Sequence, residues 1–207
     1  MTNRRLSDEL LAAYVAGSAS QGVSLVVAAH LTYCRESRAK VEALEVLAGA
    51  MLSETPNDVA APSFDDLLDR LDVPEEQQIR IDAGPLPAPV AEAVGVNFDE
   101  IPWRFRLPGV YEYEFANIDG EEMSLLKVQP GAAIPQHTHE AEEMTVIFEG
   151  RLEDGDAVYE AGDVAIADPS VDHKPRAGGD TACICLAVLS GGLRFTGPFG
   201  RALNLFT

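Results

Sequence analysis

One stretch, residues 131–150 (GAAIPQHTHEAEEMTVIFEG), constrains the fold more than any other part of this 207-residue chain. His137 and His139 are two residues apart, so on a β-strand both imidazoles leave the same face. Glu143 keeps the same parity four residues later, and past a short turn its carboxylate can reach the same point. The run MTVIF that follows is typical of a buried strand ending at Gly150. The spacing predicts two imidazoles and a carboxylate that converge.

This spacing of glycines, histidines and a glutamate resembles the first motif of the cupin superfamily at every fixed position. The second cupin motif should bring another histidine, and His173 lies at the expected distance from Gly162, although the motif's proline is displaced by one place and its usual glycine is absent. If the turn is one residue longer, Glu142 replaces Glu143 as a ligand. We expect one divalent metal to be held by four side chains, those of His137, His139, Glu143 and His173.

These four ligands do not determine which divalent metal binds. Three histidines and a carboxylate fill a tetrahedral zinc site, which would be closed and structural. The same ligands around iron, manganese or nickel leave two positions open for oxygen or a substrate. A small-molecule cupin enzyme, a dioxygenase or an isomerase, therefore stays as the alternative to a non-enzymatic role. The separate helical domain described next favours the non-enzymatic role, because a self-sufficient barrel enzyme would not require it.

The N-terminal residues predict a small all-α domain of four short helices. Ser7 can cap a first helix and a second helix is expected to begin near Ser20, each with apolar residues at helical spacing. A third helix is expected from about Ser37, and a fourth after the start signal Pro62-Ser63. Helices this short must cover their apolar faces by packing on one another or on a partner. The domain is therefore expected to bind another protein, or to form a homodimer.

The remaining sequence divides into a linker and a β-rich part. Residues 73–95 are acidic and then proline-rich without a sustained period, so we interpret them as a linker. From residue 96 onward, short runs of aromatic and β-branched residues alternate with glycine turns, the pattern of a double-sheet jelly roll. The predicted fold class is α+β, with an all-α domain at 1–72, the linker at 73–95 and an all-β cupin domain, a double-stranded β-helix jelly roll, at 96–207.

Charge and composition restrict the partners. The 34 acidic residues against 15 basic ones leave a formal net charge of -19, which repels phosphate backbones and anionic lipid. We therefore expect neither nucleic-acid nor membrane binding, and a basic protein as partner. No apolar run approaches the roughly 20 residues that span a bilayer, and no signal peptide is recognisable. Three cysteines do not make a disulfide framework, so a cytoplasmic location is expected.

His30 and Cys34 form a candidate second metal site, because residues four apart share one helix face. The segment HLTYCRES resembles the H-x3-C-x2-C signature of zinc-containing anti-sigma factors, but Ser37 stands where the last cysteine is expected. The N-terminal histidine that such proteins supply is also missing from MTNRRLSDEL. Two ligands do not make a structural zinc site, and Glu36 or Asp8 would have to complete it. The simpler interpretation is that His30 and Cys34 are buried residues of a lost site.

Cys183 and Cys185 share one face of the strand CICLA, and that face is either the barrel interior or its outer surface. They are interpreted as small packed hydrophobes, with a redox or secondary metal role as the alternative. In the second case an oxidant that modifies these thiols, or a metal ligand, changes the barrel and so releases a partner of the helical domain.

The order of these segments resembles the ChrR family of cupin-fused anti-sigma factors over nearly the full chain. The likeness is carried by SDELLAAYVAG, SLVVAAHLTYC, the histidine motif and CICLA. The resemblance implies a negative regulator, not an enzyme, that binds an extracytoplasmic-function sigma factor through its helical domain and blocks access to RNA polymerase. It also implies a cupin half that senses photo-oxidative or related stress, including singlet oxygen, and zinc in both domains.

Overall fold

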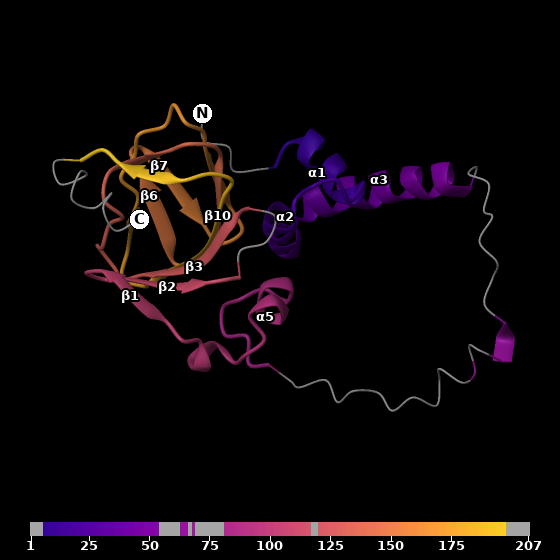
Figure 1. Cartoon of the computed structure of the whole chain (residues 1–207), viewed down its shortest axis with the longest axis horizontal. Coiled ribbons are helices and arrows are strands. Elements are labelled where there is room, and N and C mark those ends of the chain that lie inside the picture. The colour runs from indigo at the N-terminus through magenta and orange to yellow at the C-terminus, as the bar shows by residue number, and fades with distance from the viewer. Residues whose placement is uncertain (1–5, 54–62, 66–67, 69–80, 117–119, 198–207) are drawn as a thin grey trace.

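The computed structural model describes residues 6–53, 63–65, 68, 81–116 and 120–197, and Figure 1 shows helices beside a β-barrel. The helices are α1 (Asp8–Val15), α2 (Gln21–Tyr33), α3 (Arg35–Ser53) and α5 (Ala88–Val94), with a 3-10 turn at Phe98–Glu100. The strands are β1 (Arg104–Leu107), β2 (Val110–Glu114), β3 (Glu122–Val128), β4 (His137–His139), β5 (Glu143–Glu149), β6 (Arg151–Asp154), β7 (Ala157–Glu160), β8 (Val164–Ala167), β9 (Arg176–Ala177), β10 (Cys183–Leu189) and β11 (Leu193–Phe195). Helices followed by antiparallel strands confirm the predicted α+β class.

The first two helices begin where the sequence predicts, after Ser7 and after Ser20. The Ser7 hydroxyl accepts a hydrogen bond from the Leu10 amide at 3.2 Å, and the Ser20 hydroxyl accepts one from the Val23 amide at 3.3 Å. The third helix begins at Arg35, two residues earlier than predicted, because Cys34 alone is extended between α2 and α3. Of the fourth predicted helix, residues 64, 65 and 68 are helical, and most of the remainder lies outside the described residues.

Helix α5 was not predicted, because its prolines suggested a linker. Pro87 occupies the N-cap and Pro89 lies in the first turn, where a missing amide hydrogen costs nothing, so both prolines start the helix. Val90, Ala91 and Val94 bury one face of it. The predicted boundaries at residues 72 and 95 stay predictions, since residues 69–80 lie outside the described ranges.

The strands form three antiparallel sheets. Six strands make the largest, in the order β1-β2-β3-β10-β5-β8, beside the three-stranded β7-β6-β9 and the pair β11-β4. Strand β10 lies between β3 and β5, with Cys185 opposite Leu126 on one side and Ile147 on the other. Packed together, the sheets make the double-sheet jelly roll expected from the sequence.

Both faces of the sheet are buried at strands β5 and β10, which explains the nearly continuous apolar runs of these two strands. Along β10, Ile184, Leu186 and Val188 belong to the cluster shared with the helices. The alternate side chains, Cys183 and Cys185, belong to the cluster inside the barrel. The two thiols therefore face the barrel interior.

Helix α2 packs directly on the outer face of this sheet. Val26 and Val27 are fully buried in the same hydrophobic cluster as Val146 and Leu186. Gly22 permits the close approach, because a Cβ atom there would lie 2.6 Å from Glu121 Oε2 and 2.7 Å from Val188 Cγ1. The described helices and the barrel thus share one hydrophobic core. None of the helices in the described ranges is long and apolar enough to cross a membrane.

Candidate metal centre

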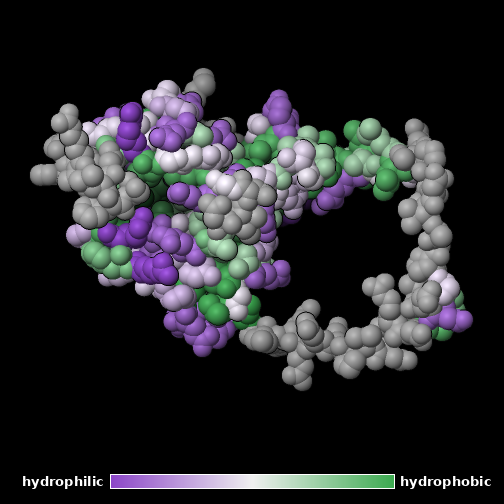
Figure 2. Space-filling model, viewed as in Figure 1, coloured by the Kyte–Doolittle hydropathy of each residue, from purple (hydrophilic) through white to green (hydrophobic). Residues whose placement is uncertain are grey.

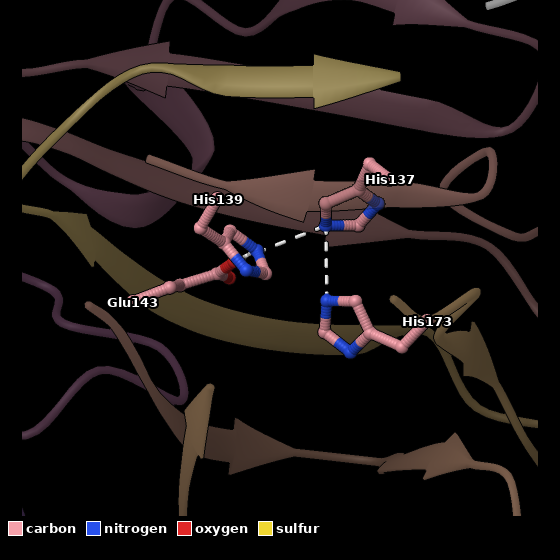
Figure 3. A group of neighbouring side chains, drawn as sticks. All are labelled: His137, His139, Glu143 and His173. Carbon is pink, nitrogen blue, oxygen red and sulfur yellow. Dashed lines mark hydrogen bonds and ion pairs between the residues drawn. The ribbon is translucent and has the colours of Figure 1, made fainter. Parts of the chain in front are cut away.

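Four side chains predicted as ligands point toward one another in the barrel (Figure 3). His137 and His139 come from β4, Glu143 is the first residue of β5, and His173 lies between β8 and β9. One donor atom from each lies within 4.8 Å of the others. His137 is 1% and His139 is 4% exposed, so these two imidazoles are shielded from solvent, whereas Glu143 and His173 are half-buried.

The backbone fixes this meeting point. The two-residue spacing on β4 sends both its imidazoles to the same side, as the sequence predicted. His173 is placed by an isolated antiparallel bridge, in which the amide of each residue, His137 and His173, donates to the carbonyl of the other at 3.0 Å. The departures from the second cupin motif therefore do not displace His173.

Hydrogen bonds to Nδ1 set the tautomers of two imidazoles. Nδ1 of His137 donates to the carbonyl of Pro135 at 2.7 Å, and Nδ1 of His173 donates to Asp154 Oδ2 at 2.7 Å. Each ring then presents the unprotonated Nε2 to the centre. These two Nε2 atoms lie 3.0 Å apart with their lone pairs facing, an arrangement that a cation between them would stabilise.

Glu143 supplies the negative charge of the cluster. Its Oε2 lies 2.5 Å from His139 Nε2, and in the described structure neither this oxygen nor either ring nitrogen of His139 has another hydrogen-bond partner. Burial opposes ionisation of Glu143, yet its contacts with His137 and His139 outweigh burial and hold the pKa of the carboxyl well below its usual range. An ionised carboxylate beside three imidazoles is a donor set that suits a divalent metal.

The structure distinguishes between Glu142 and Glu143, the two carboxylates that the sequence offered as ligand. The Glu142 side chain is exposed and does not join the cluster, whereas Glu143 does.

The two cysteines of β10 are buried. Cys183 and Cys185 are at most 1% exposed, and a hydrogen bond with Cys183, together with burial, raises the pKa of the Cys185 thiol well above its usual value. That thiol stays protonated at neutral pH, unlike reactive cysteines, which are exposed thiolates.

His30, Cys34 and Ser37 also come together, but through hydrogen bonds. Nδ1 of His30 donates to the Gly162 carbonyl at 2.7 Å, and its Nε2 lies 2.9 Å from the Ser37 hydroxyl, which is 3.2 Å from Cys34 Sγ. Glu36 is exposed, and Asp8 forms an ion pair with Lys40 at 2.7 Å. No third metal-ligating side chain in the described ranges joins His30 and Cys34.

Sequence reasoning missed Asp154, which orients His173. The sequence identified Asp154-Gly155 only as a turn, because nothing in its spacing connects the carboxylate with a histidine 19 residues away. The end of β6 brings the two together in space.

Comparisons with known proteins agree with this architecture. Residues 91–190 match a family model described as the ChrR cupin-like domain. The chain is 36% identical over 205 residues to the anti-sigma-E factor ChrR of Cereibacter sphaeroides, which covers 97% of this chain and 96% of that protein. A crystal structure of Rhodobacter sphaeroides SigE in complex with the anti-sigma ChrR aligns with a TM-score of 0.74 and 34% identity, over 90% of this chain and 98% of that chain.

Proposed function

This chain belongs to the ChrR family of cupin-containing anti-sigma factors, and from that premise we propose that it binds an extracytoplasmic-function sigma factor and blocks its access to RNA polymerase. It is then a regulator rather than an enzyme, and it acts in the cytoplasm, where RNA polymerase is found. The relative that covers nearly its whole length is named as an anti-sigma factor, and the similar crystal structure holds a sigma factor.

The observation that carries this proposal is the exposed apolar end of α3. The first half of α3 packs on the core through Val41 and Leu44. Beyond Leu44 the side chains are exposed, with Val46 at 75%, Leu47 at 58% and Leu52 at 74%. Figure 2 shows this hydrophobic surface at the end of α3 that points away from the barrel. We name Val46, Leu47 and Leu52 the α3 patch; exposed apolar groups on a projecting helix are typical of a protein-binding surface.

Charge supports the same type of partner. The net charge of -19 favours association with a basic surface, such as the side of a sigma factor that faces DNA. Glu42 and Glu45 are exposed on α3 beside the α3 patch. Apolar contacts at the centre with acidic groups at the rim match the usual anatomy of a protein interface.

The direct test is calorimetry of the full chain with its sigma factor, followed by transcription from a promoter that depends on that factor. We expect a stoichiometric complex and loss of transcription when the chain is added. Absence of binding at both low and high salt would contradict the proposal.

We also propose that the barrel cluster holds one divalent metal, with zinc as the first choice. The support is the convergent donor set and the facing lone pairs of His137 and His173. Four protein ligands suit tetrahedral zinc in a regulator, and elemental analysis separates zinc from iron, manganese or nickel. We assign no metal to His30 and Cys34, because a serine hydroxyl is their nearest third group.

We propose that the barrel is the sensing half and that it responds to oxidative stress such as singlet oxygen. The metal cluster, rather than the thiols of Cys183 and Cys185, is the site that we assign to this response, because the two cysteines pack together in the barrel and the raised pKa of the Cys185 thiol keeps it protonated. A chain with both cysteines changed to alanine is expected to repress and to be induced normally. Loss of induction in that chain would show that the thiols of Cys183 and Cys185 are needed for the response.

A further inference from the structure

A cavity of about 390 Å³ opens inside the barrel beside the metal cluster. Glu143 and His173 form part of its wall, so a molecule inside it would reach the cluster. Most of the wall is apolar and includes Leu126, Leu152 and Ile166. This volume and this lining are typical of sites for small organic molecules.

The charges around the cavity select the kind of molecule. Glu143 and Asp154 provide two carboxylates, and Asp156 provides a third at an exposed position on the wall. Among the described residues that line the cavity there is no lysine or arginine. With neutral imidazoles, a divalent ion balances the charges of Glu143 and Asp154. An anionic ligand would then be desolvated without a cationic side chain to pair with it.

We propose that this cavity binds a neutral, mainly apolar organic molecule, with one oxygen directed at the metal cluster. The inference rests on the proposed metal site in the barrel. It excludes carboxylates and phosphates as ligands of the cavity. A tetrahedral zinc site can expand to five-coordination, which leaves a position for that oxygen.

The test uses the full chain loaded with cobalt(II), whose visible absorption reports on its ligands. The probes are cyclohexanol and cyclohexanone, with cyclohexanecarboxylate as the anionic counterpart of similar shape. We expect both neutral probes to shift the cobalt absorption and to raise the unfolding temperature, and the carboxylate to do neither. Equal or tighter binding of the carboxylate would overturn the inference, as would no response to the neutral probes in a sample that holds one metal per chain.

Two variants test the cavity itself. Ala165→Leu, on the cavity wall, should abolish the response to the neutral probes, whereas the control Ala93→Leu, exposed on α5, should not. Asp156→Arg places a cation at an exposed position on the wall, so it should create carboxylate binding and keep the neutral response. Failure of Asp156→Arg to bind the carboxylate would remove the charge argument, even if Ala165→Leu does not fold.

Metal content and sigma binding are measured on the same samples. A chain without barrel metal contradicts the proposed metal site, and a chain that does not bind the sigma factor contradicts the proposed function. A metal-loaded, sigma-binding chain that does not respond to the neutral probes contradicts only the inference on the cavity ligand.

Discussion

His139 differs from the other two histidines of the metal cluster in how its ring is held. His137 and His173 are oriented through Nδ1 by Pro135 and Asp154, whereas Nδ1 of His139 has no hydrogen-bond partner in the described structure and its Nε2 lies 2.5 Å from Glu143 Oε2. No hydrogen bond to Nδ1 therefore fixes the His139 ring, and metal coordination through Nε2 would do so. We expect the orientation of His139 to depend most on the metal.

His139→Ala should reduce the metal content from one per chain to near zero. It should also abolish the stabilisation by added metal, about 2.7 kcal/mol when free metal is at 100 times its dissociation constant. Elemental analysis and thermal unfolding with and without metal measure both effects. Glu142→Ala, which removes the exposed neighbouring carboxylate, is the matched control and should keep its metal. Full metal content in His139→Ala would contradict the ligand assignment.

Asp154→Asn should weaken metal binding without removing a ligand. The carboxylate accepts a hydrogen bond from Nδ1 of His173 at 2.7 Å and so fixes the ring that faces the metal. Loss of such a partner costs roughly 10- to 100-fold in metal affinity. Competition with a chelator measures the change, and Asp156→Asn is the control at the nearby exposed carboxylate. Equal affinities for the two variants would show that Asp154 does not orient His173.

Ser37→Cys should create a zinc site in the helical part. Ser37 Oγ already lies 2.9 Å from His30 Nε2 and 3.2 Å from Cys34 Sγ, so a thiolate there gives one histidine and two cysteines. We expect the zinc content to rise from one to two per chain. Ser37→Ala should stay at one. Two equivalents in the unchanged chain would show that His30 and Cys34 bind zinc without a third cysteine.

At the scale of elements, α2 is held by the barrel at both of its ends. Glu121 lies just before β3, and its carboxylate accepts from the Ser20 hydroxyl at 2.7 Å and from the Gly22 amide at 3.1 Å. The negative charge of Glu121 also interacts favourably with the positive end of the helix dipole, at the N-terminus of α2. At the other end, His30 donates to the carbonyl of Gly162. A Cβ atom on Gly162, whose φ is +89°, would lie 2.5 Å from Tyr33 Cβ, so glycine is required there.

Glu121→Ala should therefore destabilise the chain by about 1–3 kcal/mol, because it leaves the Gly22 amide buried without an acceptor. Urea unfolding, followed by helical circular dichroism, measures this change. The control is Glu122→Ala, since Glu122 is adjacent in the chain but exposed. If both substitutions had the same small effect, Glu121 would not hold α2 on the barrel.

Elements with local signals were predictable from the sequence, and contacts between elements were not. Ser7 and Ser20 cap α1 and α2 through residues three positions ahead, so a short window contains the whole signal. Helix α5 was not predicted, because proline is common both in the first turn of a helix and in turns and linkers. The prolines of this segment therefore did not distinguish the two. The contacts of Glu121 join residues 99 and 101 positions apart, which no local pattern encodes.

The same contrast applies to the metal cluster. The spacing within one strand, a turn and the next strand predicted three of the ligands, His137, His139 and Glu143. The distance from Gly162 predicted the fourth, His173. Asp154 and the cavity arise only when β6 and β8 close the barrel. The sequence thus predicted which side chains meet, but not what orients them or what space lies beside them.

At the scale of the whole molecule, the metal cluster and the α3 patch belong to one packed body. Strand β5 begins at Glu143 and carries Val146 and Phe148 into the core shared with α2 and α3. A change at the metal cluster can therefore reach the helices through contiguous packing, without a flexible connection. Under the proposed function, the barrel would regulate sigma binding and the α3 patch would make the contact.

The most direct test of this account is the affinity of the full chain for its sigma factor when Val46, Leu47 and Leu52 are all changed to glutamine. These side chains are exposed, and glutamine is a good helix former, so the fold should persist. We predict binding at least about tenfold weaker by calorimetry, because the loss of three buried apolar contacts should cost more than the roughly 1.4 kcal/mol that corresponds to a factor of ten. Phe105→Gln, at an exposed apolar residue of the barrel, should bind as the unchanged chain does. Unchanged affinity in the triple variant would contradict the assignment of sigma binding to α3.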